Sequence, residues 1–182
     1  AFEEELAMKV IETKAINQLK DALQNEPHQH LKSAACYSLG HIGRHSSTHA
    51  KEVSDSNVLS LILYYYMDPN SSDDLKNKAL QALKKIIAAC DNLSALEPLL
   101  HVAPEKVLEQ ILERYSILLK GNTNEMMNFA QNGGLQKVQE LSSKVEQKCK
   151  NYIDEINSYF PKEMVDYYNP DYAQELLKKL DK

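Results

Sequence analysis

The chain has 182 residues, of which 43% are hydrophobic, and its formal net charge is −5 at pH 7. No run of about 18 apolar residues occurs, so neither a membrane-spanning helix nor a membrane partner is expected. The acidic balance argues against nucleic acid as the main partner, because neutralising phosphates requires a clustered excess of Lys and Arg.

Apolar periodicity predicts helices along the chain and no strand. The first three helices are expected at residues 4–11, 13–24 and 30–43. Ser46 and Ser47 offer an N-cap for a short helix that ends near Ser54. A strongly apolar helix is then expected at residues 57–67.

The next helix is expected to start after Ser71 or Ser72 and to end near Cys90. Its first turn carries Asp73 and Asp74, where carboxylates stabilise the unpaired N–H groups. A single short helix at residues 93–101 then stands where a full unit would place two. Three further helices are expected at residues 104–120, with Pro104 in first position, and at residues 125–131 and 135–141.

The pattern changes near Lys144. Shorter helices are expected at residues 145–159, 161–168 and 172–180. Five of the ten tyrosines fall in this region: Tyr152, Tyr159, Tyr167, Tyr168 and Tyr172. Because tyrosine can cover an apolar end while its hydroxyl stays in water, residues 144–182 are predicted to form a helical C-terminal cap.

The helical pattern repeats along the chain. Residues 8–19 match residues 50–61, at a spacing of 42, and residues 127–138, a further 77 along. The helical stripe Leu31, Ala35, Leu39 and Ile42 recurs 44 residues later as Leu75, Ala79, Leu83 and Ile86. Small residues at Ala35 and Ala79 would allow close packing between helices.

Repeats of about 40–47 residues are typical of armadillo and HEAT proteins, in which each unit buries its apolar face only by stacking on its neighbours. The predicted fold class is therefore all-α, an α-solenoid of armadillo repeats with a helical cap. The repeats are assigned to residues 1–143, with one degenerate unit around residues 91–120. Since residue 1 is not Met and residues 1–5 do not look like a polar end cap, we expect a fragment of a longer array.

Three cysteines, Cys36, Cys90 and Cys149, are an odd number and lie far apart in the sequence. Cys36 lies among alanines and is interpreted as a small core residue. A reducing cytosolic compartment fits this usage better than a disulfide framework.

Several motifs resemble one particular family. They are SLGHIGRH at residues 38–45, SALEPLL at 94–100, GGLQKVQE at 133–140, YIDEINS at 152–158, PKE at 161–163 and VDYYNPDY at 165–172. In this order they resemble the sperm-associated antigen 6 family, armadillo-repeat proteins of the ciliary and flagellar central apparatus. The resemblance extends over essentially the whole chain, and its tail motif is specific. It implies a non-catalytic scaffold on one microtubule of the central pair, needed for flagellar stability and motility, in a longer protein.

Armadillo rods expose a groove lined by the third helix of each repeat. Nuclear-import receptors carry Trp and Asn four residues apart there, which hold an extended basic peptide. The matching positions here are Tyr37 and His41 in one unit, and Gln81 and Lys85 in the next, so binding of nuclear-import signals is not expected. The candidate partner surface is Tyr37, His41, Arg44, Gln81, Lys84 and Lys85, although a solvated wall would explain these residues equally well.

His41, His45 and His49 have helical spacing that is compatible with zinc. However, Gly43 and the adjacent serines are expected to break the helix between them, and structural zinc usually has four close ligands. No metal or other cofactor is therefore predicted. In the run Tyr64-Tyr65-Tyr66, at least one side chain must point outward, because three consecutive positions span about 200° of a helix.

Acidic pairs such as Glu3-Glu4-Glu5 and Asp154-Glu155 have no nucleophile and base arranged beside them, and no phosphate-binding glycine loop occurs. No enzymatic activity is predicted. The predicted function, from the resemblance, is a scaffold of the axonemal central apparatus that contacts tubulin, other central-pair proteins or copies of itself. The alternatives are a soluble armadillo adaptor that binds an extended peptide, and a regulatory subunit that positions an enzyme.

Overall fold

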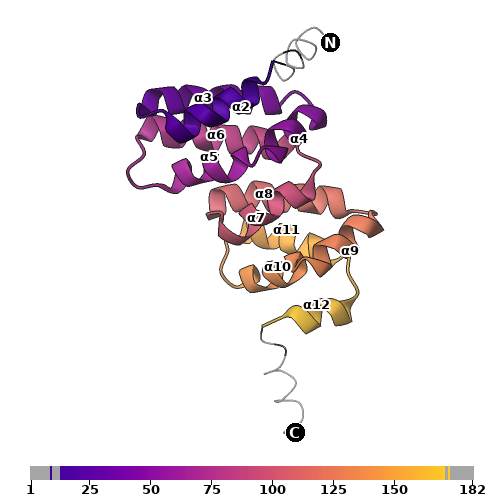
Figure 1. Ribbon diagram of the computed structural model, residues 1–182. Coiled ribbons are helices and arrows are strands. Elements are labelled where there is room, and N and C mark those ends of the chain that lie inside the picture. The colour runs from indigo at the N-terminus through magenta and orange to yellow at the C-terminus, as the bar shows by residue number, and fades with distance from the viewer. Residues whose placement is uncertain (1–8, 10–12, 171, 173–182) are drawn as a thin grey trace, which may run out of the picture. The chain divides into compact units, whose positions relative to one another are not determined.

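The computed structural model describes residue 9, residues 13–170 and residue 172 (Figure 1). Every regular element in this described part is an α-helix. The chain divides into two compact units, unit 1 at Ala1–Gln110 and unit 2 at Ile111–Lys182. The helices expected at residues 4–11 and 172–180 lie outside the described residues except at positions 9 and 172, and the acidic run Glu3-Glu4-Glu5 lies wholly outside them.

Unit 1 contains six complete helices in its described part. They are α2 (Ala15–Asn25), α3 (Gln29–Gly43), α4 (Ser47–Asp55), α5 (Val58–Met67), α6 (Asp73–Ala89) and α7 (Leu93–Val102). Helix α8 (Glu105–Leu119) crosses from unit 1 into unit 2. Unit 2 continues with α9 (Thr123–Gln131), α10 (Gly134–Ser142), α11 (Gln147–Asn157) and α12 (Lys162–Tyr168). None of the described helices is long and apolar enough to cross a bilayer.

The helix starts follow from local capping chemistry. The Ser72 hydroxyl accepts a hydrogen bond from the Leu75 N–H at 3.3 Å, and Ser46 caps α4 in the same way. The Asn122 side-chain oxygen accepts from the Glu125 N–H at 3.2 Å at the start of α9. Pro104, predicted as the first helical residue, lies immediately before α8, and its carbonyl accepts the first helical hydrogen bonds.

A left-handed residue precedes the second helix of three repeats. Lys14 before α2, Asn57 before α5 and Gly133 before α10 have φ values of 61°, 58° and 83°. These equivalent positions are 43 and then 76 residues apart, so the spacings of 42 and 77 predicted from the sequence are each wrong by one residue. The spacing of 44 between α3 and α6 is confirmed, since these helices begin at residues 29 and 73.

Helices α3 and α6 form the main packing layer of unit 1 (Figure 1). Leu39 and Leu83 occupy equivalent positions and are fully buried. The closest approach is at Gly40, where an added Cβ would lie 2.7 Å from the Ala82 Cα atom. Leu31 departs from the predicted stripe, because 44% of its surface is exposed while its counterpart Leu75 is buried.

Tyr65 ties α5 to the preceding repeat. Its hydroxyl donates to the Leu23 carbonyl and accepts from the Lys32 ammonium at 2.8 Å. Tyr65 is only 8% exposed, whereas the adjacent Tyr64 is 58% exposed. The expectation that at least one residue of this tyrosine run points outward is therefore confirmed.

The core of unit 2 contains a row of aromatic rings. Tyr115 and Phe129 lie with ring centroids 4.8 Å apart, and Phe160 follows at 6.2 Å from Phe129. Gly134 fits directly against Phe129, since an added Cβ would lie 2.4 Å from the ring. Within the predicted cap, the Tyr159 hydroxyl donates to the Ser116 carbonyl at 2.9 Å.

Candidate interaction surface on helices α3 and α6

Helices α3 and α6 bring three of the six candidate residues into contact. Tyr37 and His41 are one turn apart on α3, and their rings lie 4.2 Å apart between centroids. The Lys85 ammonium, from α6, lies 2.9 Å from His41 Nε2 and 5.5 Å from the centroid of the Tyr37 ring. The adjacent faces of two repeats therefore form one continuous surface.

The other three candidates are exposed on the same two helices or directly after them. Arg44 follows the last residue of α3, and Gln81 and Lys84 lie on α6. None of their three side chains makes a hydrogen bond or an ion pair with another described residue. Their side chains therefore remain available to a partner.

Sequence reasoning missed Lys78. Its ammonium lies 5.0 Å from the centroid of the Tyr37 ring, on the α6 side of the surface. Lys78, Gln81 and Lys85 are spaced by three and four residues, so the helical period of α6 could have revealed it. We call Tyr37, His41, Arg44, Lys78, Gln81, Lys84 and Lys85 the basic–aromatic surface.

This surface has a strong excess of positive charge. It carries four permanent cations, and α3 contains no Asp or Glu at all. In α6, the only carboxylates are Asp73 and Asp74, in the first turn. No described carboxylate forms an ion pair with Arg44, Lys78, Lys84 or Lys85.

The positive field acts on His41. Its pKa lies below the ordinary value of 6.5, first because burial disfavours the charged ring and then because of Lys85, Arg44, His45 and Lys78. His41 is therefore neutral at pH 7. Because an ammonium can only donate, Nε2 of the neutral ring accepts from Lys85 and the ring proton is on Nδ1.

The three histidines considered for zinc do not come together. His41 faces Lys85, while His49 is buried in α4 with its Nδ1 2.7 Å from the Ser46 hydroxyl. The rings of His45 and His49 are 5.7 Å apart between centroids. Among the described residues, no group of three metal-binding side chains could hold an ion.

A polar cavity of about 290 Å³ lies between α4, α5 and α7. It is lined by Ser54, Asp55, Asn57, Leu59, Ser60, Asn92, Ser94, Ala95 and Pro98. Asn92 and Asp55 already bond each other at 2.9 Å, and Asn92 also accepts from the Ser94 hydroxyl at 2.6 Å. These polar groups therefore stabilise the junction between helices.

The three cysteines are buried. Cys36 is fully buried on α3, which confirms its interpretation as a core residue. Burial raises the pKa of the Cys36 thiol to about 12. Because the thiolate is the nucleophilic form, this thiol is chemically inert in the folded protein.

No family model matches the chain. Sperm-associated antigen 6 from mouse is 40% identical over 164 residues, and the human protein is 41% identical over the same length. In both cases the match covers 90% of this chain and 32% of the relative, so the chain spans about a third of the length of these proteins.

Two of the solved structures that resemble the chain are designed armadillo repeat proteins. One, designed for modular peptide recognition, has a TM-score of 0.58 and is 18% identical, covering 93% of this chain and 75% of its own. Another, in complex with the peptide (KR)4, has a TM-score of 0.56 and is also 18% identical, covering 97% of this chain and 78% of its own. The fold is therefore an α-solenoid of the armadillo type. Over 90% of its length, the chain is similar to the C-terminal portion of sperm-associated antigen 6.

Proposed function

We propose that the chain acts as a non-catalytic armadillo scaffold in the central apparatus of motile cilia and flagella. The observation that carries this proposal is the 40% identity to sperm-associated antigen 6 over 90% of the chain. Partners would be central-pair microtubule proteins, including tubulin, or further copies of the protein. Many modest contacts along a rod would add up to firm attachment, because each contact raises the effective concentration of the next.

The domain arrangement proposed for this role places repeats at residues 1–143 and a helical cap at residues 144–182. The buried side chains of α11, which include Cys149, Ile153 and Ile156, support a covering role for the first part of this cap. Helix α12 has no buried residue, and Tyr167 on it is 74% exposed. This outer helix would therefore be available for protein contacts.

The alternative function, a soluble armadillo adaptor that captures an extended peptide in its concave groove through repeated polar side chains, is less well supported. His41 and Lys85 occupy equivalent positions of adjacent repeats, yet they differ in chemistry and contact each other. The designed relative bound to (KR)4 recognises a basic peptide. Here, Lys78, Lys84 and Lys85 would repel such a peptide.

The test is localisation of the full-length protein in flagellated cells, followed by its deletion. The proposal predicts a signal along the axoneme, and central pairs that are lost or unstable after deletion. An even cytoplasmic or nuclear distribution together with intact central pairs would contradict it. The assay should also include full-length protein lacking residues 144–182, to measure how much of the attachment depends on the proposed cap.

A further inference from the structure

We propose that the basic–aromatic surface binds an acidic segment of a protein partner. Its carboxylates would lie over Arg44, Lys78, Lys84 and Lys85, and an apolar or aromatic side chain would pack on Tyr37. This inference names the chemistry of a partner for the proposed scaffold. Its role in the cell rests on that proposed function, but the binding itself does not.

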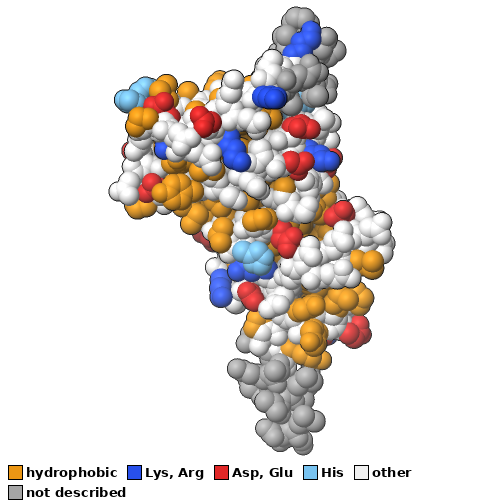
Figure 2. Space-filling model, viewed as in Figure 1, with side chains coloured by type: hydrophobic (Ala, Val, Ile, Leu, Met, Phe, Trp, Pro, Cys, Tyr) orange, Lys and Arg blue, Asp and Glu red, His pale blue; other side chains and the backbone are white. Residues whose placement is uncertain are grey.

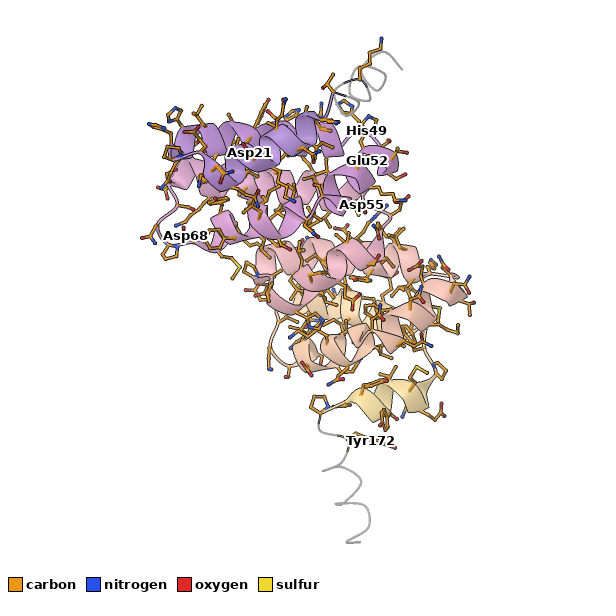
Figure 3. The ribbon with its side chains drawn as sticks, viewed as in Figure 1. Asp21, His49, Glu52, Asp55, Asp68 and Tyr172 are labelled. Atoms are coloured by element: carbon orange, nitrogen blue, oxygen red, sulfur yellow. The ribbon has the colours of Figure 1, made fainter. Side chains whose placement is uncertain are left out.

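Charge complementarity is the first argument. The whole chain is acidic, with a net charge of −5, yet this surface collects four cations without a paired carboxylate among the described residues. Elsewhere in unit 1 the signs are mixed: Figure 2 shows acidic and basic side chains interspersed over the face that it draws. Figure 3 labels Glu52 and Asp55 on α4, for example, and the α4 sequence places Lys51 next to Glu52 and one helical turn before Asp55. The local excess of positive charge on α3 and α6 therefore complements an acidic ligand.

The aromatic residue is the second argument. Tyr37 is 46% exposed, although it is held by the His41 ring on one side and approached by Lys78 and Lys85. Its hydroxyl makes no hydrogen bond to any described residue. A half-exposed tyrosine with a fixed ring is an anchor that loses little conformational entropy on binding.

The rigidity of the support is the third argument. Because Gly40 lies directly against Ala82, the backbones of α3 and α6 are in contact below the surface. The spacing between the backbones that carry these cations is therefore fixed before a ligand arrives. Such preorganisation lowers the free-energy cost of binding.

An acidic peptide fits better than a nucleic acid. A polynucleotide presents one negative charge every few ångströms and requires a longer stripe of cations. The overall negative charge of the chain would also repel a long polyanion. A peptide with carboxylates beside one apolar residue matches an exposed tyrosine ring with two lysine ammonium groups within 5.5 Å of its centroid.

The experiment measures fluorescence anisotropy with the 182-residue chain and a fluorescein-labelled peptide of eight glutamates around one central phenylalanine. Binding is expected at low ionic strength and should weaken as salt is added. The (KR)4 peptide, with the opposite charge, should not bind. The double variant Arg44→Glu/Lys84→Glu should weaken binding by about tenfold, since two attractive contacts become repulsive.

Lys14→Glu/Lys51→Glu is the matched control, because it changes the net charge equally through two exposed lysines outside the surface. It should leave the affinity within about twofold if local charge decides binding. Tyr37→Ala should lower the affinity for the peptide that contains phenylalanine. It should not change the affinity for a peptide with glycine in place of the phenylalanine. Circular dichroism of every variant establishes that the helices remain folded.

Three results would overturn the proposal: equal losses in the two double variants, equal affinity for (KR)4, or tighter binding of an eight-nucleotide single-stranded DNA than of the acidic peptide. The last result would assign the surface to phosphate polymers. None of these results depends on where the protein is found in the cell. Failure of the axonemal assignment would in turn leave the peptide affinity unchanged, so the two failures are distinguishable.

Discussion

The ammonium of Lys85 lies 2.9 Å from Nε2 of His41, and these two residues occupy equivalent positions in adjacent repeats, 44 residues apart. In a solenoid, equivalent positions on neighbouring units form a ladder along one face. Here two rungs of that ladder contact each other. Because Lys85 contacts the ring, the pKa of His41 reports the electrostatic potential at this surface.

The variant Lys85→Met should raise the pKa of His41 toward its ordinary value of 6.5, because the second-largest cause of its depression is removed. The rise should be partial, since burial, the largest cause, remains. Titration of the ring by NMR measures the shift, and Lys51→Met should leave it unchanged. An unaltered His41 pKa in Lys85→Met would mean that Lys85 does not act on the ring.

Stability should depend on His41 below neutral pH. Because the folded-state pKa is depressed, the unfolded chain binds the proton more readily, so the free energy of unfolding falls as pH drops through and below 6.5. His41→Gln should flatten this part of the pH profile, while His101→Gln, at an exposed position, should not. Urea unfolding between pH 7.5 and pH 5 measures the free energy of unfolding of the two variants and of the unaltered protein.

The variant Gly40→Ala should destabilise the protein by about 1–3 kcal/mol, because its Cβ would lie 2.7 Å from the Ala82 backbone and the two helices would have to separate. Ala34→Ser, at an exposed position of the same helix, should change stability by less than about 0.5 kcal/mol. Chemical denaturation gives both values. Equal stability of Gly40→Ala and the unaltered protein would show that α3 and α6 are not in backbone contact.

Neighbouring tyrosines of α5 should respond differently to loss of the hydroxyl. Tyr65→Phe removes hydrogen bonds to the Leu23 carbonyl and from Lys32, and should cost about 1–2 kcal/mol. Tyr64→Phe, at a mostly exposed position, should be nearly neutral. Thermal and urea unfolding distinguish the two variants, and similar losses in both would contradict the burial pattern.

Because residues 14 and 133 both have a left-handed backbone conformation, introducing glycine at one and removing it from the other should have opposite effects on stability. Lys14→Gly should stabilise the protein by roughly 0.5–1 kcal/mol, because a positive φ is unfavourable for a residue with a side chain. Gly133→Ala should destabilise it by roughly 1 kcal/mol through the backbone alone, since an added Cβ there meets nothing within 4 Å. Differential scanning calorimetry of the two variants tests the pair, and shifts of the same sign would contradict it.

Apolar periodicity and caps predicted the described helices within about two residues at each end. Alignment of the repeats was less successful, because Lys14 has a left-handed backbone conformation that Asn57 adopts readily but that a lysine does not signal. Leu31 belongs to the apolar stripe by sequence alone, but it lies in the first turn of α3 and is half exposed. The exposure of a side chain in the first turn of a helix depends on which other helix packs beside that turn.

The candidate surface was predicted in part. The spacing of 44 placed Tyr37, His41 and Lys85 on the helix faces expected to line the groove, but the contacts between them require two helices to be brought together. Lys78 was missed because it lies outside the ladder positions and reaches Tyr37 across the helix interface. The depression of the His41 pKa likewise combines burial of the ring with charges from both helices.

The concealed thiol of Cys36 offers a way to time the opening of the first unit. An alkylating reagent such as iodoacetamide can reach this sulfur only when α3 detaches from the core, so the labelling rate reports how often that opening occurs. Cys149, buried on α11 in the second unit, provides a second, separate reporter. A single mass-spectrometric time course would therefore show whether the two units unfold locally together or independently.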